Sequence, residues 1–398
     1  MIIPRWDLGL AAILCSLWLT PTLAMGADSW AQLGNRLKAS SSTFVDIDAS
    51  RHALSPSMAI GADIPFLTWS ELNAQGISQV HVKYWKQNAW ITLGGMLNVD
   101  PTHKAYDPVI VTSESIPYVG WIEVNKKGIP QLHVKHWTQG GWVSQGESLN
   151  DDLTKAAANP SMTVGFGRSY LTWTEADEKR VYQIHVKSLT ENSWVKLGDS
   201  LNEDPVRDAI EPSISMVEST PYVAWCEKAA NGGLQVYVKH WTGEAWIRDG
   251  ESLNMDLSAH ALSPSIASNG TIPYVAWVEF NEKGISQVHV KHWMNNTWVK
   301  NGGSLNVDPS HHALSPSLDF RGDTPYVAWA ESDARGVTQI HVKYWTGSDW
   351  ALEEQTLNLD VSKLALAPTL VVLEDRPYVA WKESDGAGLF SVVVKARQ

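Results

Sequence analysis

Apolar and polar residues alternate in short runs along most of the chain. The alternation is clear from Pro273 to Glu279 and again from Gln287 to Trp293, where aromatic and β-branched residues dominate. Two shorter apolar segments follow, Trp298–Leu305 and Ala313–Leu318, and turns containing Gly, Asn and Asp separate the segments. A period of two is typical of strands that bury one face, and no stretch sustains the 3.6-residue period of a helix. The pattern predicts an antiparallel meander of four strands.

This four-strand unit repeats with a period of 52 residues. A motif close to PYVAW begins at seven evenly spaced positions, with no insertion between the first and the last: Pro65, Pro117, Ser169, Pro221, Pro273, Pro325 and Pro377. A four-stranded unit of about 50 residues, repeated in this way, matches one blade of a propeller. We therefore predict an all-β fold, a seven-bladed β-propeller with four antiparallel strands per blade, spanning residues 25–398.

The two ends of the chain are predicted to share one blade. We name the strands of a blade A to D from the axis outward, so that Ala313–Leu318 is a strand A and Pro273–Glu279 a strand B. The last repeat stops at Gln398 after its strand C, whereas Trp30 to Leu37 resembles the strand D segment that begins at Trp90. We expect the strand of Trp30 to pair with the strand that ends at Lys395, which closes the ring and removes its free sheet edges.

Tryptophan is abundant, at 21 of 398 residues, and the repeat accounts for nearly all of it. Seven lie on strand B, five end strand C and seven begin strand D: Trp69, Trp121, Trp173, Trp225, Trp277, Trp329 and Trp381; Trp85, Trp137, Trp241, Trp293 and Trp345; Trp30, Trp90, Trp142, Trp194, Trp246, Trp298 and Trp350. Large flat side chains suit the faces on which blades stack. The excess of tryptophan therefore indicates the fold before it indicates a ligand.

Charged residues also recur once per repeat. A glutamate follows the strand B tryptophan by two positions, as Glu279 follows Trp277, and a lysine such as Lys291 lies on strand C. Residues two apart share one face of a strand, so the glutamate and the lysine can pair beside the indole ring. We interpret this pair as structural, and the alternative is a set of identical charged pockets.

An Asn-x-Asp pair opens the loop between strand D and the next strand A. Asn and Asp side chains commonly bond their own backbone in turns, which is the simpler interpretation. The alternative is weak Ca²⁺ ligation by carboxylate oxygens. The candidate calcium ligands are Asp100, Asp152, Asp204, Asp256, Asp308 and Asp360. We expect no other metal and no organic cofactor.

Histidine occurs in two settings. On strand C it recurs at His81, His133, His185, His289 and His341, where a structural imidazole in a tryptophan-lined interface is favoured over a metal ligand because no close His/Cys cluster of zinc type is present. The D–A loops add His52, His103, His260, His311 and His312, which we expect near one face of the ring. Imidazoles there could make binding depend on pH.

The first residues resemble an export signal. Leu8–Leu23 is apolar and uncharged, and small residues at Thr22 and Ala24 fit cleavage after Ala24. We therefore predict a signal peptide at residues 1–24 and an exported protein, periplasmic, extracellular or at the cell surface; the alternative is an uncleaved membrane anchor. No later segment has the roughly 20 apolar residues of a span. With Cys15 inside the leader, Cys226 has no partner for an intrachain disulfide.

The formal net charge of −12 argues against nucleic acid as a partner, because phosphate contacts need clustered Lys and Arg. Motifs of common catalytic sites, such as G-x-S-x-G, a P-loop or H-E-x-x-H, are missing from the sequence. A single catalytic centre needs different residues from different blades, and these blades are strongly alike. The sequence therefore predicts a protein that is not an enzyme.

Repeat stretches such as WTGEAWIRDGESLN, from Trp241, resemble those of secreted bacterial seven-bladed propellers. The near-identity of the blades is similar to that of propeller lectins, whose sugar sites recur between blades, and this resemblance implies glycan binding. The candidate ligand-binding residues are Trp85, Trp137, Trp241, Trp293 and Trp345, with the D–A loop histidines His52, His103, His260, His311 and His312.

These observations lead to one hypothesis and two alternatives. The hypothesis is a non-enzymatic, exported, multivalent binding protein with a glycan as its partner. The first alternative is a scaffold or cell-surface component that binds a protein partner and has no small-molecule site. The second is a hydrolase or lyase on the same fold, which a single asymmetric cleft with several acidic and arginine side chains would favour.

Overall fold

The computed structural model describes residues 29–34, 45–48, 50–191 and 193–398. All regular elements in these residues are β-strands. The predicted signal peptide, residues 1–24, lies outside the described residues. In the described part of the chain, no helix is long and apolar enough to cross a membrane.

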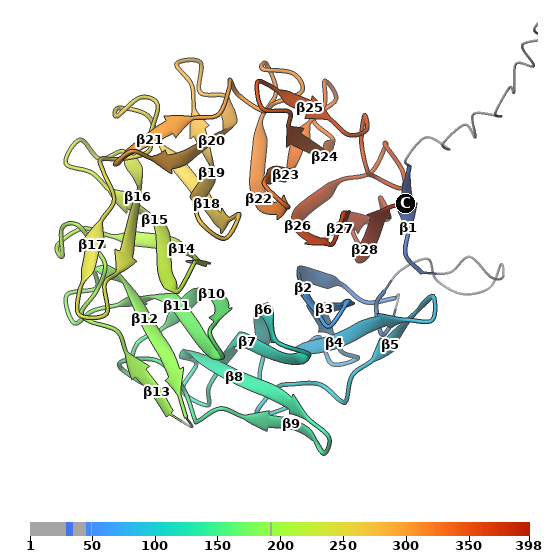
Figure 1. The fold of residues 1–398 in the computed structure, drawn as a ribbon. Coiled ribbons are helices and arrows are strands. Elements are labelled where there is room, and N and C mark those ends of the chain that lie inside the picture. Colours follow the sequence, from blue (N-terminus) through green and yellow to red (C-terminus); the bar gives the residue numbers. More distant parts are fainter. Residues whose placement is uncertain (1–28, 35–44, 49, 192) are drawn as a thin grey trace, which may run out of the picture.

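Seven four-stranded antiparallel sheets form a ring, which confirms the predicted seven-bladed β-propeller. Figure 1 shows the ring along its axis, with one strand of every sheet nearest the centre. These inner strands, the A strands of the blades in order, are β2(Ala53–Gly61), β6(Ala105–Ser113), β10(Ala157–Gly165), β14(Ala209–Val217), β18(Ala261–Ser268), β22(Ala313–Arg321) and β26(Ala365–Leu373).

The remaining strands follow outward in each blade. The B strands are β3(Ile64–Leu72), β7(Ile116–Val124), β11(Arg168–Ala176), β15(Thr220–Lys228), β19(Pro273–Phe280), β23(Thr324–Ser332) and β27(Arg376–Ser384). The C strands are β4(Ser78–Lys86), β8(Pro130–Thr138), β12(Tyr182–Thr190), β16(Leu234–Trp241), β20(Ser286–Met294), β24(Thr338–Trp345) and β28(Phe390–Arg397). The D strands are β5(Ala89–Thr92), β9(Gly141–Ser144), β13(Ser193–Lys196), β17(Trp246–Arg248), β21(Thr297–Lys300), β25(Trp350–Leu352) and β1(Trp30–Gln32).

The first strand of the chain completes the last blade. β1 pairs antiparallel with β28, with Trp30 opposite Arg397 and Gln32 opposite Lys395. In Figure 1 the blue β1 lies beside the red strands at the end of the sequence. The predicted closure of the ring is therefore confirmed, and the outer edge of the seventh blade is paired.

Strand D is shorter than the sequence pattern suggests. The segment predicted from Trp298 to Leu305 is a strand only as far as Lys300. Gly302 has a φ of +68°, which ends the extended conformation. The chain nevertheless stays on the sheet, because Leu305 N donates to Val288 O at 2.9 Å.

The core lies between blades. The strand B tryptophans are fully buried in all seven blades, and each packs with residues of the preceding blade. Trp121 of the second blade, for example, shares a cluster with Val80, Val82 and Leu97 of the first. Each blade therefore buries its apolar face on a neighbour, as expected when no sheet can form a core alone.

Deleting residues 25–45 from a protein that starts at residue 25 should sharply lower its melting temperature. The deletion removes β1 and leaves the edge of β28 unpaired. Thermal unfolding followed by circular dichroism measures the effect, and the control is the chain that lacks only residues 1–24. An unchanged melting curve would show that the closing strand does not stabilise the ring.

Candidate functional site

The repeated glutamate holds the loop between two blades. In the fifth blade, Glu279 accepts hydrogen bonds from the indole N–H of Trp277 at 3.0 Å and from the backbone N–H groups of Met255 and Asp256 at 2.8 Å each. The same three bonds occur at Glu71, Glu123, Glu175, Glu227, Glu331 and Glu383. Each glutamate thus joins its own strand B to the loop that arrives from the preceding blade.

The repeated lysine binds that same loop rather than the glutamate. Lys291 Nζ donates to Leu253 O at 2.7 Å and lies 5.7 Å from the centre of the Trp277 ring. Among the described residues, no ion pair within 4 Å joins the glutamate and the lysine of one blade, so the expected direct pair is wrong in its geometry. Burial is the main reason that the pKa of Lys291 is lowered, and the charge of Glu279 opposes this change. Both side chains have the structural role that the sequence favoured.

The asparagine of the Asn-x-Asp pair ties the loop back to the preceding blade. Asn98 Oδ1 accepts from Val80 N at 3.0 Å, and its Nδ2 donates to Ser78 O and His103 O. The same acceptor contact occurs at Asn150, Asn202, Asn254, Asn306 and Asn358. One loop is therefore fixed to both blades that it connects.

The candidate calcium ligands lie in these loops. Asp100 Oδ1 accepts from the backbone and the hydroxyl group of Thr102, and similar turns occur at Asp152, Asp256, Asp308 and Asp360, whereas Asp204 accepts from Val206 N. These turn bonds are the main cause that lowers the pKa of Asp100. Among the described residues, no group of three or more His, Cys, Asp or Glu side chains could hold a metal ion. Calcium binding stays a prediction.

The candidate tryptophans lie at the end of strand C and pack on the first residue of strand D or its neighbour in the same blade, a second tryptophan. Each packs on the strand D tryptophan of its own blade, with ring centroids 5.2–5.4 Å apart for Trp85, Trp137, Trp241, Trp293 and Trp345. Trp137 also lies over Gly94 of the preceding blade, where an added Cβ would be 2.7 Å from the ring. Each ring thus packs on a tryptophan of its own blade, and the Trp137 ring also packs on the preceding blade.

The candidate histidines lie at the other end of the strands. His52, His260 and His312 each accept a backbone N–H through Nδ1, from Phe390, Leu234 and Ser286 respectively. His103 and His311 lie 3.8 Å from Asp100 and Asp308. Because strand C ends at the C–D turn and these residues lie in the D–A loops, the structure does not bring the tryptophans and histidines into one site.

The strand C histidines lie beside the buried indoles. His289 lies 5.9 Å from Trp277 between ring centroids, and burial lowers the pKa of His289 to about 4. A neutral imidazole over a buried ring agrees with the structural interpretation. Cys226 is fully buried, and burial raises the pKa of its thiol well above the usual value, as expected for a core residue rather than a nucleophile.

A ring of strained residues surrounds the axis, and the sequence pattern did not predict it. Every A–B strand pair contains a β-bulge, as between Leu54 and Ser57 in the first blade. One residue in each bulge, immediately before a proline, has a φ between 48° and 55°: Ser55, Asp107, Asn159, Glu211, Ser263, Ser315 and Ala367. This conformation is unfavourable for such residues, and strain of this kind occurs preferentially at functional sites.

These seven residues and their prolines line one central pocket of about 450 Å³. The backbone conformation of these residues repeats in all seven blades, but their side chains differ. Asp107 and Glu211 are the ionisable side chains that line the pocket. Ser55 Oγ donates to Asp107 at 3.1 Å, and Ser263 N donates to Glu211 at 2.7 Å. Burial is the main cause that raises the pKa of Asp107, opposed by the hydrogen bond from Ser55 and by the charge of Lys382.

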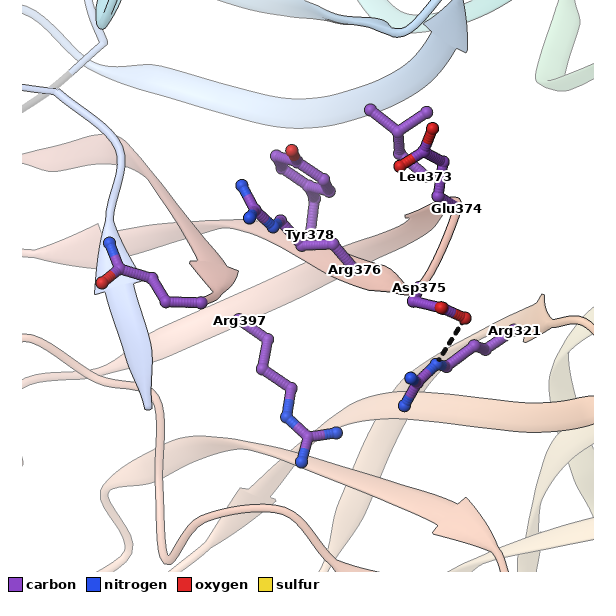
Figure 2. Close-up of a pocket in the computed structure, with 8 residues that line it drawn as sticks. Arg321, Leu373, Glu374, Asp375, Arg376, Tyr378 and Arg397 are labelled. Carbon is purple, nitrogen blue, oxygen red and sulfur yellow. Dashed lines mark hydrogen bonds and ion pairs between the residues drawn. The ribbon is translucent and has the colours of Figure 1, made fainter. Parts of the chain in front are cut away.

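A second asymmetric feature lies at the A–B turns of the sixth and seventh blades. This cleft has a volume of about 400 Å³. Figure 2 shows Arg321, Arg376 and Arg397 around the turn that carries Glu374 and Asp375. Several acidic and arginine side chains in one cleft are the feature expected above for an enzyme. The cleft and the central pocket lie near opposite ends of the A strands.

Comparison with known proteins gives matches of fold. No family profile matches the sequence, and no curated protein is similar to it. A Trypanosoma rangeli sialidase in complex with the inhibitor DANA superposes with a TM-score of 0.50 at 10% identity, covering 87% of this chain and 55% of the sialidase. A Hadza microbial sialidase gives 0.47 at 12% identity, covering 80% and 73%, and a thermostable family-43 glycoside hydrolase gives 0.40 at 14%, covering 61% and 88%.

The sialidase match at 0.50 shows a shared propeller fold, and this chain spans about half the length of that enzyme. The sialidase match contradicts two predictions from sequence, the non-enzymatic glycan-binding function and the prediction that the protein is not an enzyme, because the solved propeller that superposes on this chain is an enzyme and not a lectin. The propeller-hydrolase alternative agrees better with that match. The similarity of the blades hid the differences at the bulge, which is where a single asymmetric centre can form.

Replacing Glu279 by alanine should lower the free energy of unfolding by about 3 kcal/mol, because three buried N–H donors lose their acceptor. Urea denaturation of the variant measures this loss. Glu282→Ala, at an exposed glutamate in the B–C loop of the same blade, is the control and should change little. Equal stability of the two variants would contradict the role of Glu279.

Replacing Asp46 by asparagine should stabilise the protein. Asp46 stands where the other repeats have asparagine; its Oδ1 accepts from Val392 N at 2.9 Å, while its Oδ2 is buried without a partner. Burial raises the pKa of Asp46 to about 7, so the folded state loses stability as the pH rises from about 4 through 7. An asparagine at this position would be neutral and could donate to two carbonyl groups, as Asn98 does.

We expect Asp46→Asn to gain about 1–3 kcal/mol at pH 8 and less at pH 5. Melting temperatures measured at both pH values test this, with Asn98→Asp as the reverse variant, which should destabilise more at pH 8. A gain of the same size at both pH values would show that ionisation of Asp46 is not the cause.

Proposed function

We propose that the protein is a hydrolase that cleaves glycosidic bonds at the central pocket, with Asp107 and Glu211 as its catalytic pair. The observation that carries this proposal is the presence of two carboxylates, in different hydrogen-bonding environments, among the strained bulge residues of one pocket. Most glycoside hydrolases use two carboxyl groups that flank the bond to be cleaved. The propeller fold shared with a sialidase supports the same class.

Asp107 is the candidate general acid. The burial that raises the pKa of Asp107 favours its protonated form at a pH where an exposed aspartate is ionised. A protonated carboxyl group can donate to the leaving-group oxygen of the glycoside. Ser55, which donates to Asp107 Oδ1, positions the carboxyl group from the neighbouring blade.

Glu211 is the candidate base or nucleophile. Its Oε2 accepts a backbone hydrogen bond from Ser263 at 2.7 Å, a contact that suits a charged carboxylate. One blade separates β6, which carries Asp107, from β14, which carries Glu211, so the two carboxyl groups face the axis from different directions. A sugar at the mouth of the pocket would then have an acid on one side and a carboxylate on the other.

The remaining lining residues suit a polar ligand. Ser, Asn and Thr side chains supply hydrogen-bonding groups around the pocket, and the bulge prolines give it rigid walls. The apolar segment at residues 8–23 supports export, and we propose that the enzyme acts on polysaccharide outside the cytoplasm.

Asp107→Asn and Glu211→Gln should each lower the rate of polysaccharide hydrolysis by about 10²–10⁴-fold. Release of reducing ends from a panel of polysaccharides gives the readout. Glu282→Gln, at an exposed side chain outside the pocket, is the control and should retain activity. On a 4-nitrophenyl glycoside, whose leaving group needs no proton, Asp107→Asn should lose less activity than Glu211→Gln.

The pH profile provides a further check of the roles. Because the pKa of Asp107 is raised, wild-type activity should extend to higher pH than an exposed aspartic acid would allow and should fall as Asp107 ionises. Asp107→Asn should abolish this alkaline limb. The absence of hydrolysis from the whole panel, or wild-type rates in both carboxyl variants, would refute the proposal.

A further inference from the structure

The junction between the sixth and seventh blades differs from the other junctions. At four junctions the tryptophan at the end of strand C lies over a glycine of the preceding blade: Trp137 over Gly94, Trp241 over Gly198, Trp293 over Gly250 and Trp345 over Gly302. One repeat after Trp345 and Gly302, the chain has Arg397 and Glu354 instead. At this junction an arginine and a glutamate therefore stand where the four other junctions have a tryptophan packed on a glycine. The cleft of Figure 2 lies at the same junction.

Two arginines of the cleft are attached to buried side chains. Arg321 is hydrogen-bonded to the buried Tyr326. Arg397 Nη1 lies 2.9 Å from Glu353 Oε1, whose side chain is only 4% exposed. In Figure 2 the side chains of Arg321 and Arg397 extend to the same side of the turn. The buried Glu353 thus fixes Arg397 in place.

The remaining contacts of the arginines are weak. Arg321 Nε lies 3.0 Å from Asp375 Oδ1, but the Asp375 side chain is 83% exposed. An ion pair so exposed to solvent contributes little, because water screens it. Arg376, on the same turn, is exposed, and its side chain makes no hydrogen bond or ion pair within the described residues. To bind a ligand, Arg321 can therefore leave the exposed Asp375 at small cost, and Arg376 loses no side-chain contact.

We propose that this cleft binds an oxyanion, a carboxylate or phosphate group, through Arg321 and Arg376, with Arg397 held nearby by Glu353. The planar guanidinium fork matches both anions with two parallel hydrogen bonds. Three arginine side chains line the cleft together with two carboxylate side chains, those of Glu374 and Asp375, in a chain whose net charge is −12. The site is separate from the central pocket and does not depend on the proposed hydrolase activity.

Isothermal titration calorimetry at low ionic strength tests the proposal with three probes: inorganic phosphate, glucuronate and uncharged glucose. We expect at least one anion to bind and glucose not to bind. Arg376→Gln and Arg321→Gln should each weaken binding at least 10-fold. Arg168→Gln is the matched control, because Arg168 occupies the same turn position in the third blade and should leave binding unchanged.

Asp375→Asn gives a test in the opposite direction. Removing the carboxylate that competes for Arg321 should tighten anion binding several-fold, an effect that damage to the fold would not produce. Binding of phosphate alone would identify a phosphoryl ligand, and binding of glucuronate alone a carboxylate ligand. The proposal fails if neither anion binds at millimolar concentration, if glucose binds equally well, or if Arg168→Gln weakens binding as much as Arg376→Gln.

Discussion

The ring depends on a buried carboxylate that accepts three hydrogen bonds in every blade. Removing a charged group from water is costly unless hydrogen bonds replace the lost hydration. At Glu279 an indole N–H and two backbone N–H groups provide that replacement, and the two backbone donors belong to the loop from the preceding blade. The strand B tryptophan therefore has two roles, since its ring fills the interface and its N–H orients the glutamate. A loop that could otherwise move is fixed at the same point where the two sheets pack.

The fold could be predicted almost completely from the sequence because each structural contact is repeated. The alternating pattern, the 52-residue period and the positions of the tryptophans all describe interactions that every blade needs, so seven copies give the same signal. The closing strand was also predictable, because Trp30 keeps the strand D pattern although it lies more than 300 residues from its partner strand β28. The contacts of Glu279 and Lys291 could not be predicted, because both side chains bind the loop from the preceding blade, which is distant from them in sequence, instead of pairing with each other.

The candidate site could not be predicted by the same reasoning, because it consists of departures from the repeat. Asp107 and Glu211 stand before the strand A proline, where other blades have Ser, Asn or Ala. Only the closed ring shows that these positions meet at one pocket. A signal was nevertheless present in the sequence. When the seven repeats are aligned, the residue at this position is acidic in two repeats and uncharged in five, whereas the next residue is always proline. The candidate tryptophans and histidines had the opposite property: they recur, and the structure gives them contacts that hold blades and loops together.

The composite seventh blade has a consequence for how the molecule could have arisen and could be rearranged. The repeated glutamate gives every D–A loop the same hydrogen bonds to the blade after it, so this part of each junction is alike around the ring. The seventh blade differs from the others in its connectivity, because its strand D, β1, precedes the first blade in sequence whereas its other three strands follow the sixth. New termini opened in any C–D turn would leave a similar composite blade elsewhere, and a chain built from a duplicated unit needs only one such interlocked pair of ends to become a closed ring.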